Sequence, residues 1–256
     1  MKLKKDGTPN KTTVGELQYK YDAGDVVTNR NGDRYKFIKR TNNKVWVEFL
    51  DHRKYCLAHC VSSASAVAGT LKDWYAPSVY GVGVTGLLHE SDTPIYYLWK
   101  SCLNRVYGRY HHAYSDCTVS EEFIQFENFY WWYKQNEVVD GYNYQLDKDL
   151  FSSGSKVYSS ETCCLLPKEV HDSLYRSNSP CKAVNETTNG YSLGNVFGSH
   201  MWNDDTRYFK TRKEALEFYW WCREDRVKQS AYKWKDYLMP HVYQRLLDFK
   251  FNTGEL

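Results

Sequence analysis

The spacing of hydrophobic residues changes along this chain from period two to helical spacing, and this change limits the folds that it can adopt. Apolar residues alternate with polar ones in Arg34–Ile38 and Val45–Leu50, and Asn and Gly residues separate these runs. Short alternating runs between such turns predict a small antiparallel sheet or barrel. From Ile95 to Val106 the apolar residues instead recur at the spacing of one helix face. We therefore expect an α+β chain in which a small β module precedes a helical region.

The helical region is expected to contain two successive helices. Pro94 stands where a helix tolerates proline in its first turn. A second helix is predicted to begin near Thr118, because Glu121 follows three residues later in a capping-box pattern. An aromatic stripe then follows at helical spacing, made of Phe123, Phe126, Phe129, Tyr130 and Tyr133. Core packing is the more economical explanation of this stripe.

The C-terminal part is expected to combine short strands with a long helix. Short extended runs lie between Tyr191 and Phe209. Thr211 and Glu214 form a capping-box pattern, which predicts a helix that continues to about Lys233. Pro240 is expected to begin a last helix.

These patterns divide the chain into six segments. We expect a basic arm at 1–18, a β module at 19–65 and a linker at 66–93. A central helical region at 94–174 follows, then a Ser-, Asn-, Thr- and Gly-rich linker at 175–190 and a C-terminal domain at 191–256.

Charge and cysteine content indicate a cytoplasmic protein that can bind nucleic acid through local patches. The net charge of the 256 residues is +3, which permits such patches without requiring them. The eight cysteines are irregularly spaced, and Met1–Asn10 lacks the apolar core of a signal peptide. Reduced thiols in a cytoplasmic protein are therefore expected. No apolar run approaches the length of a membrane span, so no membrane contact is predicted.

One segment carries a residue set that resembles a zinc site. His52, Cys56, His59 and Cys60 have near-zinc spacing. However, they fall in the predicted sheet region, where the adjacent His59 and Cys60 would point in opposite directions. We expect that this cluster does not bind zinc.

A central stretch combines acidic residues on a predicted strand with a histidine on a predicted helix. Asp147 and Asp149 lie two residues apart, which on an extended strand directs both carboxylates to one face. Pro167 can begin a helix, and His171 lies within its first turns. Carboxylate and imidazole are ligands for first-row divalent ions, and carboxylate also suits Mg²⁺. By spacing alone, solvated surface residues are the better explanation of this pattern.

Several motifs in one order extend this interpretation. They are Trp99–Tyr107, Tyr114–Phe123, Phe126–Phe129, Trp132–Tyr133, Leu146–Asp149 and Tyr158–Cys163. Together they resemble a family of bacteriophage HNH-type endonucleases, many of which act as free-standing homing nucleases. The resemblance implies a ββα-metal finger within 94–174, with Asp147 and His171 as ligands of one divalent ion, Mg²⁺ or Mn²⁺.

The same resemblance assigns roles to the two neighbouring residues. HNH fingers place a histidine beside the first aspartate as general base, and Lys148 holds that place in this chain. Lys148 is thus the candidate base and Asp149 a secondary catalytic candidate. Lysine acts as a base only where it is strongly desolvated. In the family's helix, His171 stands where asparagine is usual.

The C-terminal part resembles a second module. Phe209–Ala215, Tyr219 and the basic helix that follows are similar to the plant ethylene-response-factor type of DNA-binding domain. In that domain a three-stranded sheet reads the major groove and a helix packs behind it. The candidate DNA contacts are Arg207, Lys210, Arg212, Lys213, Arg223 and Lys228. Their partner would be double-stranded DNA, bound in a salt-dependent manner.

The sequence therefore predicts a metal-dependent DNA endonuclease that hydrolyses phosphodiester bonds with one divalent ion. It would act in the host cytoplasm if a phage encodes it. Lysine at position 148 keeps an alternative open, namely a catalytically impaired DNA-binding protein with an accessory or regulatory role. The aromatic-rich composition, 17% of the residues, keeps open a third alternative, an inhibitor of a host protein.

Overall fold

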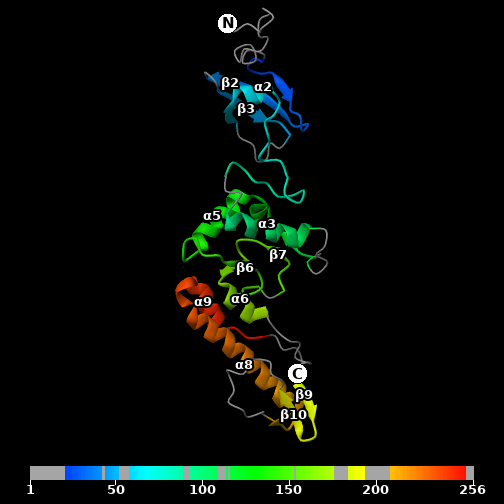
Figure 1. Cartoon of the computed structure of the whole chain (residues 1–256), viewed down its shortest axis with the longest axis vertical. Coiled ribbons are helices and arrows are strands. Elements are labelled where there is room, and N and C mark those ends of the chain that lie inside the picture. Colours follow the sequence, from blue (N-terminus) through cyan, green and yellow to red (C-terminus); the bar gives the residue numbers. More distant parts are fainter. Residues whose placement is uncertain are drawn as a thin grey trace, which may run out of the picture. The chain divides into compact units, whose positions relative to one another are not determined.

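The computed structural model is a mixed α+β structure that separates into two compact units, Met1–Leu88 and His89–Leu256 (Figure 1). It describes residues 21–41, 44–51, 58–88, 93–108, 114, 116–152, 154–175, 184–193 and 208–251. The predicted α+β class is confirmed. Within these ranges, no helix is both long enough and apolar enough to cross a membrane.

The first unit contains a four-stranded antiparallel sheet with the strand order β1-β2-β3-β4. Its strands are β1 (Val26–Thr28), β2 (Arg34–Thr41), β3 (Lys44–Phe49) and β4 (His59–Ser62). Tyr35, Phe37, Val45, Val47 and Phe49 are buried, as the alternating pattern predicts. The expected small antiparallel β module is thus confirmed.

The core of this unit continues past residue 65, where the predicted linker begins. Helix α2 (Ser63–Val67) places Ala66 in the sheet's core, and Leu71 joins the same cluster. The Tyr35 hydroxyl donates to the Ala66 carbonyl, and the Asn29 side-chain amide donates to the Leu71 carbonyl at 2.9 Å. This stretch consists mostly of small and polar residues, among which the few apolar residues that pack on the core are hard to recognise. Its sequence therefore resembles a linker.

The second unit begins with the predicted helical pair. Helix α3 (Pro94–Tyr107) has Pro94 in its first turn, and the Thr93 hydroxyl accepts the N–H of Tyr96 at 3.3 Å. Helices α4 (Glu121–Ile124) and α5 (Phe126–Asn136) follow. The aromatic stripe is largely core, since Phe123, Phe126, Phe129 and Tyr133 are buried whereas Tyr130 is partly buried.

The predicted helix start near Thr118 is wrong. Thr118 and Val119 form strand β5 (Thr118–Val119), which pairs in parallel with β7 (Val157–Tyr158). The helix instead begins after Ser120, whose hydroxyl accepts the N–H of Phe123 at 3.2 Å. Both Thr118 and Ser120 are residue types that can cap a helix. Because Thr118 and Val119 pair with the distant strand β7, the helix begins after Ser120.

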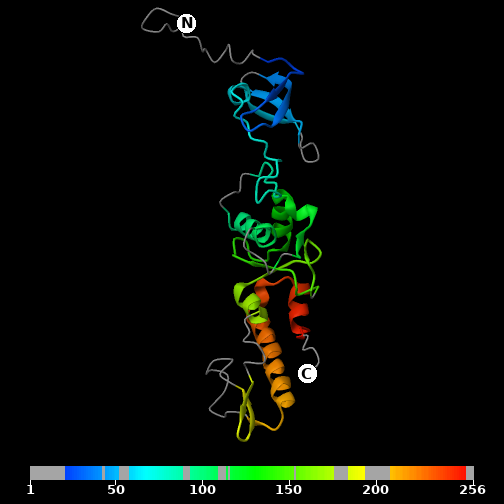
Figure 2. The ribbon, with the colours of Figure 1, turned by 90° about the vertical axis from the view of Figure 1, so that its right-hand side faces the viewer.

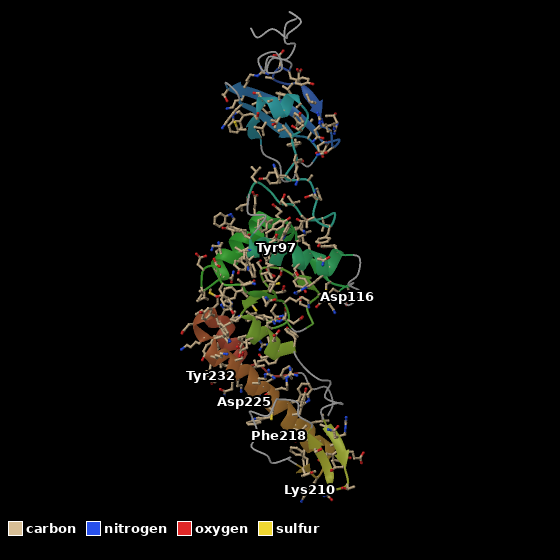
Figure 3. All side chains as sticks on the ribbon, in the orientation of Figure 1. Tyr97, Asp116, Lys210, Phe218, Asp225 and Tyr232 are labelled. Carbon is tan, nitrogen blue, oxygen red and sulfur yellow. The ribbon has the colours of Figure 1, made fainter. Side chains whose placement is uncertain are left out.

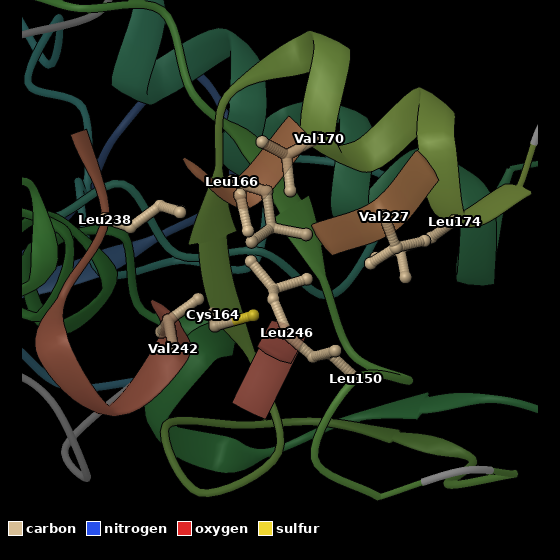
Figure 4. Packing of buried hydrophobic residues seen from close by; sticks show 10 residues of the cluster. Leu150, Cys164, Leu166, Val170, Leu174, Val227, Leu238, Val242 and Leu246 are labelled. Carbon is tan, nitrogen blue, oxygen red and sulfur yellow. The ribbon is translucent and has the colours of Figure 1, made fainter. Parts of the chain in front are cut away.

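A second core joins the centre of the chain to its C-terminal helices. It contains residues of β8 (Cys164–Leu166), α6 (Lys168–Tyr175), α8 (Arg212–Lys233) and α9 (Pro240–Leu247), together with Leu150 from the turn after β6 (Gln145–Asp147). Figure 4 shows the side chains of Leu166, Val170, Val227 and Leu246 converging there. The predicted start of α9 at Pro240 is confirmed. The short 3-10 helix η2 (Lys235–Tyr237) connects α8 to the segment before α9.

The C-terminal part of the second unit contains a three-stranded antiparallel sheet with the order β11-β10-β9. Its strands are β9 (Val184–Thr187), β10 (Gly190–Leu193) and β11 (Tyr208–Phe209). Val184 packs on Ala215 and Leu216 near the start of α8. The sheet and the pair α6 and α9 lie at opposite ends of α8 (Figure 1 and Figure 2).

Strand β9 lies within the predicted linker at 175–190, which is a correction to that assignment. The hairpin turns at Thr188–Asn189 and continues at Gly190, whose φ is +122°. A Cβ at Gly190 would lie 2.3 Å from the carbonyl oxygen of Phe209, so the close pairing with β11 requires glycine.

Candidate functional site

The candidate site lies where strand β6 and helix α6 meet. Strands β6 and β8 pair antiparallel, with Asp147 opposite Cys164. Strand β8 leads through Pro167 directly into α6, which carries His171 in its first turns. A strand pair followed by a helix therefore brings together two residues that are 24 positions apart in the sequence.

Asp147 is buried and its two carboxylate oxygens have different environments. Oδ1 accepts the backbone N–H groups of Asp149 at 3.0 Å and Leu150 at 2.8 Å. Oδ2 lies 3.9 Å from Nε2 of His171. The turn after β6 thus fixes the carboxylate through one oxygen and directs the other toward the imidazole.

The expected pairing of two carboxylates on one strand face is wrong. Strand β6 ends at Asp147, and the chain turns at once because Oδ1 of Asp147 captures the next two N–H donors. Asp149 therefore lies in the turn, half-exposed, with its carboxylate directed to Lys148. An aspartate that bonds to its own downstream backbone ends an extended run.

Lys148 is buried and serves as a hydrogen-bond donor inside the loop. Its Nζ donates to Oδ1 of Asp149 at 2.5 Å and to the carbonyl of Ser155 at 2.8 Å. The same nitrogen lies 5.7 Å from the ring centroid of Tyr158. These contacts occupy the nitrogen as a hydrogen-bond donor, which disfavours the role of general base.

The electrostatic environment of His171 favours the neutral imidazole. Burial, the largest cause, lowers the pKa of His171 below its ordinary value, and Arg105 and Lys168 lower it further against the opposing effect of Asp147. The ring of Tyr175 packs against His171 with 4.9 Å between centroids. Neutral imidazole is the form that binds metal ions.

Tyr175 and Arg105 are residues of this site that the sequence reasoning missed. Burial and the nearby Asp147 carboxylate raise the pKa of Tyr175, which therefore keeps its proton. The signal for Tyr175 was available, because it follows His171 by four residues on the same face of α6. Arg105 lies near the end of α3 and acts on the pKa of both His171 and Tyr158. Its proximity depends on tertiary packing, which gives no local signal.

The donor set of Asp147 and His171 is compatible with a small divalent ion. Two ligands of one ion with bonds of about 2.1 Å are separated by about 3 Å when adjacent and about 4.2 Å when opposite. The observed 3.9 Å lies between these two values, so the side chains would have to shift by a few tenths of an ångström or more to hold one ion. Across the described ranges, no group of three or more His, Cys, Asp or Glu side chains is arranged to hold a metal. An ion at this pair would complete its coordination with water or substrate oxygens, as Mg²⁺ commonly does.

Five of the candidate DNA contacts lie along α8 or just before it, and four of them reach the surface. Lys210, Arg212 and Lys213 are exposed at the helix start beside the three-stranded sheet, where Figure 3 labels Lys210. Lys213 forms a long ion pair with Glu217, 4.0 Å from Nζ to Oε1. Lys228 is half-exposed further along the helix. Arg207 lies outside the described residues.

Arg223 has a different environment from the other basic residues of α8. Only 2% of it is exposed. Its guanidinium donates to the carbonyls of Ser173 at 3.3 Å and Leu174 at 3.1 Å, at the end of α6. It also lies 4.7 Å from the ring centroid of Phe251. Arg223 therefore docks α8 onto α6 and offers no surface to DNA.

The four candidate zinc residues cannot be assembled from the described part of the chain. His52 and Cys56 lie outside the described residues, and so does the side chain of His59. Cys60 is an exposed free cysteine on β4.

Comparisons with protein-family models, with curated proteins and with solved structures find no match to this chain.

Proposed function

We propose that this protein is a metal-dependent DNA endonuclease of the HNH, or ββα-metal, class, similar to the phage homing endonucleases. One observation carries the proposal: Asp147 at the end of β6 and His171 on α6 face each other at 3.9 Å. A buried carboxylate beside a neutral imidazole is a suitable pair of ligands for one divalent ion, and the Tyr175 hydroxyl that bonds to Asp147 would share this carboxylate with the ion. The proposed setting is the cytoplasm of the host cell.

Asp147 Oδ2 and His171 Nε2 would hold the ion in this proposal. The ion, Mg²⁺ or Mn²⁺, would stabilise charge on the leaving oxygen of the cleaved phosphodiester. The two N–H bonds to Oδ1 keep the Asp147 carboxylate in one orientation. Tyr175 packs on the imidazole and restricts its ring. Arg105 supplies positive charge near the pair, which suits a phosphate substrate.

DNA binding would come from the C-terminal domain. Lys210, Arg212 and Lys213 form an exposed basic group beside a three-stranded sheet, and Lys228 lies further along α8. Phosphate contacts from such residues position a protein on the duplex. Arg223 is excluded from the proposed surface because it is buried.

A DNA cleavage assay with Mg²⁺ or Mn²⁺ tests the proposal. The wild-type protein is expected to nick or cut duplex DNA, and Asp147→Asn is expected to reduce the rate by about two orders of magnitude or more. His171→Ala is expected to have a comparable effect. His241→Ala is the matched control, because His241 is an exposed histidine on α9.

Two results would count against the proposal. The first is wild-type protein that leaves phage and host DNA intact with either ion. The second is cleavage that Asp147→Asn and His241→Ala retain equally. Thermal unfolding of each variant shows whether a lost activity reflects lost folding.

The environment of Lys148 favours a second candidate, a DNA-binding accessory or regulatory protein with an impaired nuclease finger. The lysine stands at the position of the general base, and its ammonium is engaged by Asp149 and Ser155. This candidate predicts tight, salt-sensitive DNA binding without cleavage. Metal-dependent nicking that is lost in His171→Ala would refute it.

A further inference from the structure

A groove of about 440 Å³ lies between α6 and α8, apart from the Asp147–His171 pair. Helix α6 contributes Lys168, Glu169 and Asp172, and α8 contributes Arg226, Gln229 and Ser230. Tyr142 and Trp234 form its aromatic part. This volume is within the usual range for small-ligand sites, about 300 to 1,000 Å³.

Most charged side chains around the groove form ion pairs with each other. Oε2 of Glu169 accepts from Nζ of Lys233 at 2.7 Å and from Nε1 of Trp234 at 3.0 Å. Nζ of Lys168 donates to Oδ2 of Asp172 at 2.8 Å. These bonds fix the shape of the groove and hold the Trp234 ring in place.

The groups that remain available lie on one face of α8. Arg226, Gln229 and Ser230 are spaced at i, i+3 and i+4, so their side chains are neighbours. Arg226 and Gln229 make no hydrogen bond or ion pair with the described residues. The Ser230 hydroxyl is buried without a hydrogen-bond partner in the described structure, and the residue is only 7% exposed. A buried hydroxyl without a partner points to a missing polar group at this place.

The charge of the groove favours an anion. Lys168, Arg226 and Lys233 carry three positive charges, and Glu169 and Asp172 carry two negative charges, which leaves a net charge of about +1. Since each acid is already paired with a lysine, the remaining positive charge is that of Arg226, which also acts on the nearby Glu169 carboxylate. A guanidinium binds phosphate through parallel N–H bonds.

The aromatic part favours a ligand with a flat ring. The centroids of Tyr142 and Trp234 lie 5.8 Å apart, and Tyr237 braces both rings at 4.9 Å and 5.1 Å. Such rings, held in fixed orientations, present faces and edges to a nucleobase.

We propose that the groove between α6 and α8 binds a nucleotide, with the phosphate on Arg226 and Gln229 and the base against Tyr142 and Trp234. The nucleotide is either free in solution or part of a nucleic-acid strand, and the chemistry of recognition is the same. This proposal does not depend on the endonuclease proposal, because it involves neither Asp147 nor His171.

Isothermal titration of the full-length protein with deoxyadenosine 5′-monophosphate and with a 5′-phosphorylated single-stranded oligonucleotide tests the proposal. Arg226→Gln is expected to weaken binding of both ligands at least about tenfold, because it removes a charge-assisted contact. Gln229→Leu is expected to weaken binding to a smaller extent. Lys100→Gln, which removes an exposed charge from α3, is expected to bind like the wild type.

The pattern of the two ligands identifies the source of the nucleotide. Equal affinity for both indicates a site for free nucleotide, whereas at least about tenfold tighter binding of the oligonucleotide indicates a strand site. The proposal is overturned if neither ligand binds the wild type at about 1 mM. It is also overturned if Arg226→Gln, folded by its thermal unfolding curve, binds like the wild type.

Discussion

The ammonium of Lys148 donates a 2.5 Å hydrogen bond to the carboxylate of its sequence neighbour, Asp149. Adjacent residues on an extended strand point to opposite faces, so this contact exists only because the strand ends at Asp147. The ion pair makes Lys148 a structural element of the loop after β6. A nuclease with this loop would need its water-activating base elsewhere.

Replacing Lys148 by methionine separates its structural role from a role as general base. We expect Lys148→Met to lower the free energy of unfolding by about 1 to 2 kcal/mol, because it leaves the Ser155 carbonyl and the half-exposed Asp149 without their donor. Cleavage by the folded fraction should stay within about tenfold of wild type, whereas loss of a general base costs about 10²- to 10⁴-fold. Urea denaturation and cleavage rates measure the two effects. Lys156→Met is the control. A hundredfold loss of cleavage rate in Lys148→Met that Lys156→Met does not show would indicate that Lys148 acts as the base.

Replacing Arg223 should mainly lower stability, whereas replacing Lys228 should mainly affect DNA binding, although both are basic residues of α8. Arg223→Met is expected to lower the free energy of unfolding by about 2 to 4 kcal/mol, since two buried carbonyls of α6 lose their donor. Lys228→Gln should change it by less than about 0.5 kcal/mol but lower the salt dependence of DNA binding by about one unit of slope. Chemical denaturation and DNA titration at several salt concentrations provide the comparison. A stable Arg223→Met protein with a reduced salt slope would place Arg223 on the DNA surface instead.

The Glu169 carboxylate predicts a pH dependence of stability. Its hydrogen bond from Lys233, and then that from Trp234, lower the pKa of Glu169 below the ordinary value of 4.5. A lowered pKa in the folded state stabilises the protein above pH 4.5, and this contribution disappears as the pH falls through the folded-state pKa. Wild type should therefore be more stable than Glu169→Gln at neutral pH, and the two should converge in acid. Unfolding curves across this range test the prediction, and a gap that persists at the lowest pH would contradict it.

The cysteines should differ strongly in reactivity. Burial raises the pKa of the Cys163 thiol to about 12 and also raises that of Cys102 and Cys164. Since the thiolate is the reactive form, these three should resist N-ethylmaleimide at pH about 8 until the protein unfolds. Cys60, which is exposed, should react in the native state. Peptide mass mapping of native and denatured samples resolves each site, with Cys60→Ser as the control. Rapid native labelling of Cys163 would show that this region opens.

Elements with a local signature could be predicted from the sequence. The alternation in β2 and β3 predicts the buried face that contains Tyr35 and Val47, because one sheet face packs on the core. The Thr211–Glu214 capping box forms both of its hydrogen bonds, at 3.2 Å and 3.3 Å, and opens α8 as expected. Each of these signals depends on residues within a few positions of one another.

Features that depend on distant contacts could not be predicted. A basic residue on a helix is normally solvated, but Arg223 is buried because the end of α6, about 50 residues earlier, presents two carbonyls to it. The hydrogen bond from Lys148 likewise forms only because the loop that follows brings the Ser155 carbonyl back to the ammonium. In the candidate site, the facing of Asp147 and His171 follows from the β6–β8 pairing, which the spacing alone left open.

Helix α8 belongs to two cores, since Leu216 packs on the C-terminal sheet and Val227 packs with α6 and β8. The eleven positions between them correspond to about 17 Å at 1.5 Å per residue, or about five base-pair steps of DNA. An unbroken helix keeps these two cores at a fixed distance from each other. An endonuclease built in this way would cut at a constant offset from the bases that its sheet contacts. Lengthening α8 by two helical turns, about 10 Å, would displace the cut by about three base pairs.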